Sequence, residues 1–102
     1  MAGFVKAAKA QDVALGSGKR VEVGGKKIAI FNVDGKYYAI DDTCTHRGGP
    51  LSEGGLDGKE VTCRWHGAVF DVTTGEVLGP PAPKPVSRYD VRISENDIEV
   101  KV

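Results

Sequence analysis

Short runs of alternating apolar and polar residues dominate the chain and predict β-strands. Turn residues bound each run, and β-branched or aromatic side chains are enriched within it. No segment sustains a period of 3.6 residues, so the expected helix content is limited to a single turn at residues 11–14. The predicted strands cover residues 4–8, 20–23, 26–33, 36–41, 60–62, 69–71, 86–94 and 97–102.

Three two-residue turns are predicted to join neighbouring strands into hairpins, at Gly24-Gly25, Asp34-Gly35 and Glu95-Asn96. Asp34-Gly35 is the strongest signal, because both residue types tolerate positive φ. The pattern therefore predicts an all-β protein, built as a small antiparallel β-sandwich or barrel. The chain has 102 residues, which fits one domain over 1–102 with a modest core.

Composition excludes several classes of function. The 14 basic residues balance the 14 acidic ones, which argues against binding to nucleic acid or to an anionic membrane. No apolar run approaches the roughly 20 residues that cross a bilayer, and the first residues lack a signal-peptide pattern. We therefore expect a soluble cytoplasmic protein, in which the two cysteines serve as ligands more readily than as a disulfide.

All cysteines and histidines of the chain fall in two short blocks. Cys44 and His46 form a C-x-H motif, Cys63 and His66 form a C-x2-H motif, and sixteen residues separate the two motifs. Two thiolates and two imidazoles are a complete four-ligand set for a metal centre. Because strand signals lapse around both blocks, we expect two loops at one tip of the fold.

Two kinds of metal centre satisfy this ligand count. A single tetrahedral zinc would stabilise a small domain. Common zinc modules, however, keep the cysteines in one pair and the histidines in another, whereas each block here supplies one of each. The mixed order suits a two-iron centre, with Cys44 and Cys63 on one iron and His46 and His66 on the second.

The two blocks closely resemble those of the Rieske [2Fe-2S] ferredoxins, in which C-x-H and C-x2-H loops hold one cluster. The resemblance extends through the Pro-rich segment 79–85 to the terminal hairpin. It implies that the Pro-rich segment covers the cluster and that a side chain at the glycine after His66 would crowd the second loop. The residues that it places around the cluster are Arg47, Gly48, Gly49, Trp65, Gly67, Pro80 and Pro81. The alternative interpretations are an ordinary tight turn for Gly48 and Gly49, simple packing for Trp65, and a rigid strand connection for Pro80 and Pro81.

The resemblance implies an electron carrier and not an enzyme. Four protein ligands leave no open position on either iron, which favours one-electron transfer. Both histidines are committed to the cluster, so none is left for a second, mononuclear iron, and the glycines fit no dinucleotide fingerprint. We expect a monomer that takes electrons from a flavin-containing reductase and passes them to a terminal oxygenase of a dioxygenase-type system. Transient docking is expected near His46 and His66.

Charge counting and the neighbouring residues predict where the reduction potential falls. An oxidised +2 core with two thiolates and two neutral imidazoles is a neutral site, so an added electron meets less repulsion than with four thiolates. The high-potential respiratory branch has a disulfide and hydroxyl donors to sulfur, and the matching positions here are Gly49, Trp65, Ala68 and Phe70. Without those donors we predict the low end of the class range of about −150 to +300 mV.

Two other functions remain open at this point. One is the small Rieske-type subunit of an assimilatory nitrite reductase or of another stable redox complex, and the other is a structural zinc-binding interaction module. Among the charged residues, Arg47 and Arg64 adjoin ligands and could steer an acidic partner. An acidic, solvated rim is an equally good interpretation of Asp41, Asp42, Glu53, Asp57 and Glu60.

Overall fold

The computed structural model describes residues 3–43, 50–64, 67–79 and 86–101. In these ranges the chain forms antiparallel strands and two single-turn 3-10 helices, which confirms the predicted all-β class. None of the helices there has the length and apolar character needed to cross a lipid bilayer. The elements are β1 (Phe4–Lys9), η1 (Ala10–Asp12), β2 (Gly18–Val23), β3 (Lys26–Val33), β4 (Lys36–Asp41), η2 (Leu51–Glu53), β5 (Gly55–Asp57), β6 (Glu60–Thr62), β7 (Val69–Asp71), β8 (Val77–Gly79), β9 (Arg88–Tyr89), β10 (Val91–Ser94) and β11 (Asp97–Lys101).

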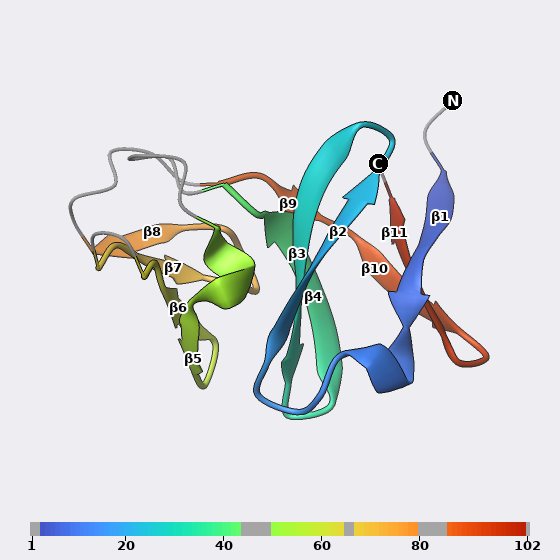
Figure 1. Ribbon diagram of the computed structural model, residues 1–102, viewed down its shortest axis with the longest axis horizontal. Coiled ribbons are helices and arrows are strands. Elements are labelled where there is room, and N and C mark those ends of the chain that lie inside the picture. The colour runs from blue at the N-terminus through green and yellow to red at the C-terminus, as the bar shows by residue number, and fades with distance from the viewer. Residues whose placement is uncertain (1–2, 44–49, 65–66, 80–85, 102) are drawn as a thin grey trace.

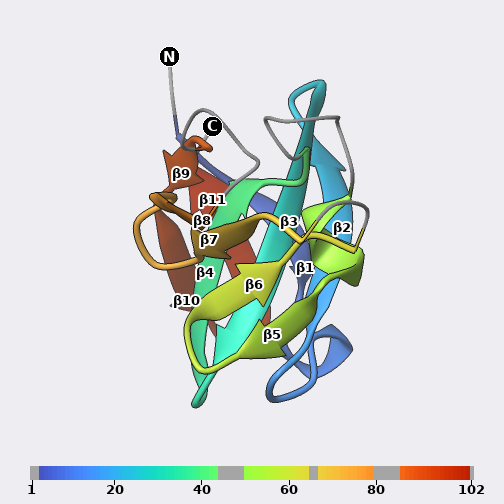
Figure 2. The same ribbon diagram turned by 90° about the vertical axis from the view of Figure 1, so that its left-hand side faces the viewer.

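The strands form three antiparallel sheets, with the orders β1-β11-β10, β2-β3-β4-β9 and β5-β6-β7-β8. Figure 1 shows the β2-β3-β4 sheet in the middle, with the β5–β8 sheet on one side and the β1-β11-β10 sheet on the other. Figure 2 looks from the side of β5–β8 and shows that sheet in front of β3 and β4. The central sheet is therefore covered on both faces.

Burial on both faces explains the continuous apolar run of β3. Its side chains alternate between two cores: Ala29 and Phe31 face the β5–β8 sheet, whereas Ile28 and Ile30 face the β1-β11-β10 sheet. We call the first the loop-side core, and its buried residues are Ala29, Phe31, Ile40, Leu51, Val61, Cys63, Ala68, Phe70, Val72 and Val86. We call the second the termini-side core, and its buried residues are Ala8, Val13, Val23, Ile28, Ile30, Ala39, Ile98 and Val100.

The three predicted hairpin turns are confirmed. Asp34 and Gly35 have φ of 52° and 88°, the two positive values that a two-residue hairpin turn of this kind requires. The Gly24-Gly25 turn has the same form, with φ of 59° and 80°, and joins β2 to β3. At the third turn Glu95 adopts a φ of 58°, and β10 pairs with β11 from Ser94 and Asp97 outward.

The structure departs from the predicted elements in three places. The run 86–94 is split at Asp90, because β9 pairs with β4 of the central sheet whereas β10 pairs with β11 of another sheet. β5 and β8 were not predicted, since three residues are too few to show an alternating pattern. The single helical turn lies at Ala10–Asp12 and not at 11–14, and a second one, η2, follows Pro50.

Gly54 provides a test of how closely η2 packs on β6. A Cβ atom at Gly54 would lie 2.3 Å from the Thr62 carbonyl oxygen, whereas one at Gly55 would meet no described atom within 4 Å. We predict that Gly54→Ala lowers the free energy of unfolding by about 1–3 kcal/mol, because the backbone must shift. Gly55→Ala is the matched control and is expected to change it by less than about 1 kcal/mol. Equal losses in the two variants, measured by chemical denaturation, would contradict this packing.

Tyr89 provides a test of the contact that holds β9 beside β4. Its hydroxyl donates a 2.6 Å hydrogen bond to Asp41 Oδ1. Burial, together with this hydrogen bond and the carboxylate charge, raises the pKa of Tyr89 from its usual value of about 10 to about 12. The neutral phenol is favoured in the folded state, so its contribution to stability is present below pH 10 and is lost as the pH rises through 12.

We predict that an ultraviolet difference titration of wild type against Tyr89→Phe isolates a tyrosine that ionises near pH 12. Asp41→Asn should lower that midpoint, because the variant keeps a hydrogen-bond acceptor but loses the charge that opposes ionisation. A Tyr89 component with its midpoint near 10 in the wild type would show that the contact with Asp41 does not form in solution.

Candidate metal centre

Cys63 is the one predicted ligand within the described ranges. The residue is only 2% exposed, and its thiol forms no disulfide within the part of the chain that the structure describes. Gly67, from the predicted cluster environment, is also described. The other predicted site residues lie outside the described residues: Cys44, His46, Arg47, Gly48, Gly49, Trp65, His66, Pro80 and Pro81.

The chain positions on either side of the first ligand block are held together by backbone and side-chain contacts. Thr43, directly before Cys44, forms an antiparallel bridge with Pro50. Asp42 accepts the Leu51 N–H through its carbonyl at 2.6 Å and the Ser52 N–H through its carboxylate at 2.7 Å. The block is therefore anchored at both ends to the terminus of β4.

The second ligand block lies in the tight connection between β6 and β7. The last strand pair is Thr62 with Val69, and beyond it Cys63 donates its N–H to the Ala68 carbonyl at 2.7 Å. Gly67 donates its N–H back to the Cys63 carbonyl at 3.0 Å. These contacts place Cys63 at the base of a short closed loop.

The backbone conformation of Gly67 is a reason for glycine at this position. Its φ of 77° lies in the left-handed region, which a side chain disfavours. A Cβ atom there would meet no described atom within 4 Å, so crowding against the described residues is not the constraint. The crowding that the resemblance implies concerns loop residues outside the described ranges and stays a prediction.

The Pro-rich segment 80–85 leaves the described chain close to the second block and rejoins it at the turn between β7 and β8. Gly79 pairs with Val69, the first residue of β7. At the other end Val86 donates its N–H to the Gly75 carbonyl at 2.9 Å, and a Cβ at Gly75 would lie 2.3 Å from the Val86 carbonyl oxygen. Both ends of the segment are therefore attached to the β7–β8 hairpin.

Asp71 orders the turn that supports this attachment. Its carboxylate accepts hydrogen bonds from the Thr73 N–H and hydroxyl at 2.8 and 2.6 Å, and Lys59 Nζ lies 3.4 Å away. Burial alone would raise the pKa of Asp71, but the Thr73 hydrogen bonds and the Lys59 charge outweigh it and hold the pKa below its ordinary value. The ionised carboxylate therefore stabilises the turn at neutral pH.

The bases of all three segments meet in the loop-side core. Leu51 follows the first block, Cys63 and Ala68 bracket the second, and Val86 follows the Pro-rich segment; all four are buried there. Arg64 and Glu53 also pair across the two blocks at 3.7 Å, although both are exposed and contribute little energy. Figure 1 shows β5–β8 and η2 together at one end of the molecule. This agrees with the prediction that both blocks lie at one tip.

The interpretation of the acidic residues as a solvated rim is wrong for two of the five. Asp42 is 2% exposed, and Asp41 is half-buried, with its carboxylate bound to the Tyr89 hydroxyl and the Ser87 N–H. Both carboxylates are satisfied inside the protein, because β4 ends between two segments that need hydrogen-bond acceptors. The exposed members are Glu53, Asp57 and Glu60.

Sequence reasoning missed the residues that support the blocks. These residues are Asp42 and Gly54, which are not ligands. No motif in the sequence distinguishes the buried Asp42 from the exposed Asp57. A usable signal was present in one respect, because Asp42 directly follows a buried strand and precedes a ligand by two residues. A carboxylate there leaves the sheet at a point where the chain turns and backbone N–H groups need partners.

The described chemistry fits an iron–sulfur centre. Cys63 is buried at the base of a tight loop and forms no disulfide with any residue of the described ranges, so it is suitable as a thiolate ligand when a cation is present. The other three predicted ligands, Cys44, His46 and His66, are known here from the sequence alone. The apolar loop-side core around Cys63 supplies the low-dielectric, water-excluding side of such a site.

Comparisons with known proteins agree with this chemistry. The family profile of the Rieske [2Fe-2S] domain matches residues 3–90. The biphenyl dioxygenase ferredoxin subunit of Pseudomonas sp. (strain KKS102) is 44% identical over 98 residues, which cover 95% of this chain and 90% of that protein.

Two solved structures share the fold over most of the chain. The structure described as a complex of reduced oxygenase and oxidized ferredoxin in carbazole 1,9a-dioxygenase contains a chain with a TM-score of 0.89 and 36% identity, covering 96% of this chain and 92% of that one. The Sphingomonas yanoikuyae B1 ferredoxin has a TM-score of 0.92 at 28% identity, with 98% and 99% covered. This chain belongs to the Rieske [2Fe-2S] domain family and carries one cluster of that type.

Proposed function

We propose that this protein is the ferredoxin component of a dioxygenase-type system, which carries single electrons from a flavin-containing reductase to a terminal oxygenase. The observation that carries the proposal is the 44% identity to a dioxygenase ferredoxin subunit over 95% of this chain and 90% of that protein. In this role the protein is an electron-transfer component and not a catalytic enzyme. The relatives favour this role over a nitrite reductase subunit, and the family favours an iron–sulfur cluster over zinc.

The proposed ligands are Cys44 and Cys63 on one iron and His46 and His66 on the other. A Rieske cluster supplies storage and release of one electron. The chain supplies the geometry: the Asp42 and Thr43 contacts close the first block, and the Cys63 and Gly67 contacts close the second. A short route from the cluster to a docked oxygenase is expected at the two histidines, with a small transient interface.

We further propose that residues 1–102 form one domain that works as a cytoplasmic monomer. The described strands form two cores on opposite faces of one central sheet. The sheet that contains β1 and β11 packs on one face, and the sheet that flanks Cys63 packs on the other. Small electron carriers act as transient encounter partners, for which a monomer is sufficient.

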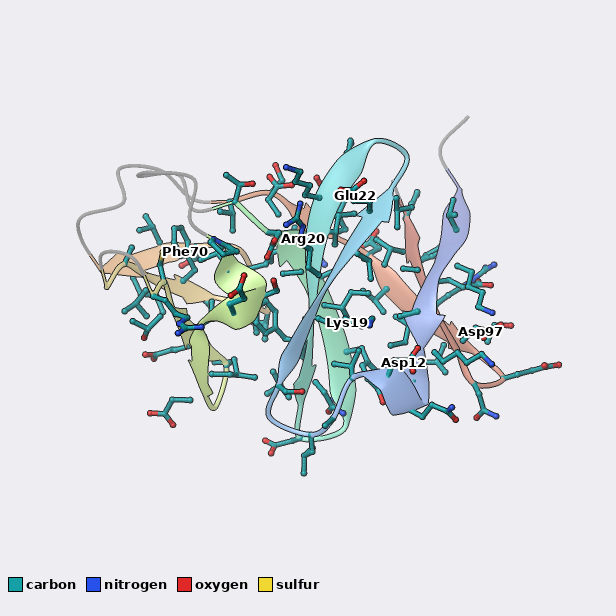
Figure 3. All side chains as sticks on the ribbon, in the orientation of Figure 1. Asp12, Lys19, Arg20, Glu22, Phe70 and Asp97 are labelled. Atoms are coloured by element: carbon teal, nitrogen blue, oxygen red, sulfur yellow. The ribbon has the colours of Figure 1, made fainter. Side chains whose placement is uncertain are left out.

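The described neighbours of the second block support a low reduction potential. Ala68 and Phe70 are fully buried, and neither carries a hydroxyl that could donate to sulfur. Phe70 is labelled in Figure 3 within the β5–β8 half of the molecule. Fewer donors leave the extra negative charge of the reduced state less stabilised, which lowers the potential within the class.

The ligand set is tested by substituting each proposed ligand in turn. We predict two irons and two acid-labile sulfides per chain in the wild type, and loss of most of both in Cys44→Ser, Cys63→Ser, His46→Asn and His66→Asn. Arg64→Gln is the matched control, because Arg64 adjoins Cys63 but is exposed and pairs only with Glu53 in the described structure. A full complement of iron in any ligand variant would remove that residue from the set, and a single zinc per wild-type chain would overturn the site.

The function is tested by anaerobic rapid mixing with the reductase and the oxygenase of a biphenyl dioxygenase system, followed by absorbance. We predict that the reductase reduces this protein by one electron per chain, and that the reduced protein then transfers that electron to the oxidised oxygenase. Cys63→Ser, which lacks the proposed ligand, should do neither. A loaded, reducible wild-type protein that transfers no electron to the oxygenase would contradict the proposed function while leaving the ligand set intact.

A further inference from the structure

Asp42 combines three features that no other described carboxylate shares. Its side chain is almost completely buried, with the residue 2% exposed. Its carbonyl and its carboxylate accept the N–H groups of Leu51 and Ser52, at 2.6 and 2.7 Å. It also stands two residues before Cys44, so these contacts join the chain before the first block to the chain after it.

A buried carboxylate needs a compensating charge, and Arg20 supplies it. Arg20 Nε lies 3.6 Å from Asp42 Oδ2, and the guanidinium also reaches Glu22, with 3.7 Å between its nitrogen and the carboxylate oxygen. The Asp42 side chain is 3% exposed, whereas that of Glu22 is 67% exposed. Figure 3 labels Arg20 and Glu22 along β2. Asp42 is therefore the buried partner of a half-exposed Arg20 side chain, which is 45% exposed, and water screens this pair less than it screens the pair with Glu22.

We propose that Asp42 is a positioning residue for the cluster: its buried negative charge, balanced by Arg20, locks the two ends of the first ligand block together and helps to set the reduction potential. The inference rests on the proposed ligand set, because Cys44 and His46 are the residues that the lock would position. Thr43 and Pro50 pair immediately outside the block and extend the same closure.

This role has an electrostatic part, the charge of Asp42, and a positioning part, its hydrogen bond with Ser52. Different variants remove one or the other. Asp42→Asn keeps an oxygen that accepts the Ser52 N–H but removes the charge, so Arg20 keeps only its exposed contact with Glu22. Arg20→Gln does the opposite and leaves the Asp42 charge unbalanced. Reduction adds negative charge to the site, so a local gain of positive charge favours the reduced state and a local gain of negative charge opposes it.

The first measurement is the midpoint potential of the holoprotein. We expect Asp42→Asn to raise it and Arg20→Gln to lower it. Glu22→Gln is the matched control: it removes the other carboxylate that contacts Arg20, but that carboxylate is exposed and touches neither end of the block. Its potential should stay within error of the wild type, because water and salt screen the lost charge. The electrostatic part would be overturned if Asp42→Asn and Arg20→Gln shifted the midpoint potential in the same direction. It would also be overturned if Glu22→Gln shifted the potential as much as Asp42→Asn does.

The second measurement is the rate at which an iron chelator removes the cluster from the oxidised protein. Asp42→Ala leaves the Ser52 N–H without its acceptor, and the loss of this part-buried hydrogen bond predicts iron release about tenfold faster. Asp42→Asn should lie between Asp42→Ala and the wild type. Equal rates in all three would overturn the positioning part, and if Asp42→Ala fails to fold, the comparison of Asp42→Asn with the wild type decides it.

Failure of this inference is distinct from failure of the proposed ligand set. A wild-type protein without two irons and two sulfides would refute the ligand set. A fully loaded wild type whose Asp42 and Arg20 variants keep its potential and its iron-release rate would refute the role of Asp42 alone.

Discussion

The loop-side core is the part of the molecule on which the rest depends, because the three segments that carry or adjoin the proposed ligands begin or end in it. Leu51, Cys63, Ala68 and Val86 are all buried there. Each of these residues adjoins one of the three segments. Its burial fixes where the segment begins or ends. Removing water from these apolar side chains therefore also fixes the described positions from which the ligand blocks start or at which they end.

Polar contacts at the end of β4 complete what the hydrophobic core begins. Asp41 faces Ser87 and Tyr89, which follow the Pro-rich segment, while Asp42 faces Leu51 and Ser52, which follow the first block. Successive residues of a strand point to opposite sides, so two adjacent carboxylates can serve two segments at once. Together with the loop-side core, these contacts hold the surroundings of the cluster before any metal bond is counted. A small domain gains further stability from the metal bonds themselves.

The sequence was sufficient to predict the parts of the structure that depend on local chemistry. The turns at Gly24-Gly25 and Asp34-Gly35 need residues that accept positive φ, and their sequences show it directly. The ligand blocks could be proposed because cysteine and histidine are rare in this chain and occur only in two clusters. β5 and β8 were missed because three-residue strands are stabilised by their neighbours and not by their own pattern. The buried state of Asp42 depends on Arg20 and Ser52, which are distant in sequence, so a local pattern could not reveal it.

The central claim is that one two-iron cluster is held by the two cysteines and the two histidines of this chain. Pulsed electron paramagnetic resonance of the dithionite-reduced holoprotein tests it most directly when the protein is prepared with ¹⁵N-labelled histidine, because the chain has only two histidines. We predict one spin per two irons, with strong couplings to the nitrogens of two histidines. A reduced cluster with no histidine nitrogen coupling would contradict it and would require ligands other than His46 and His66.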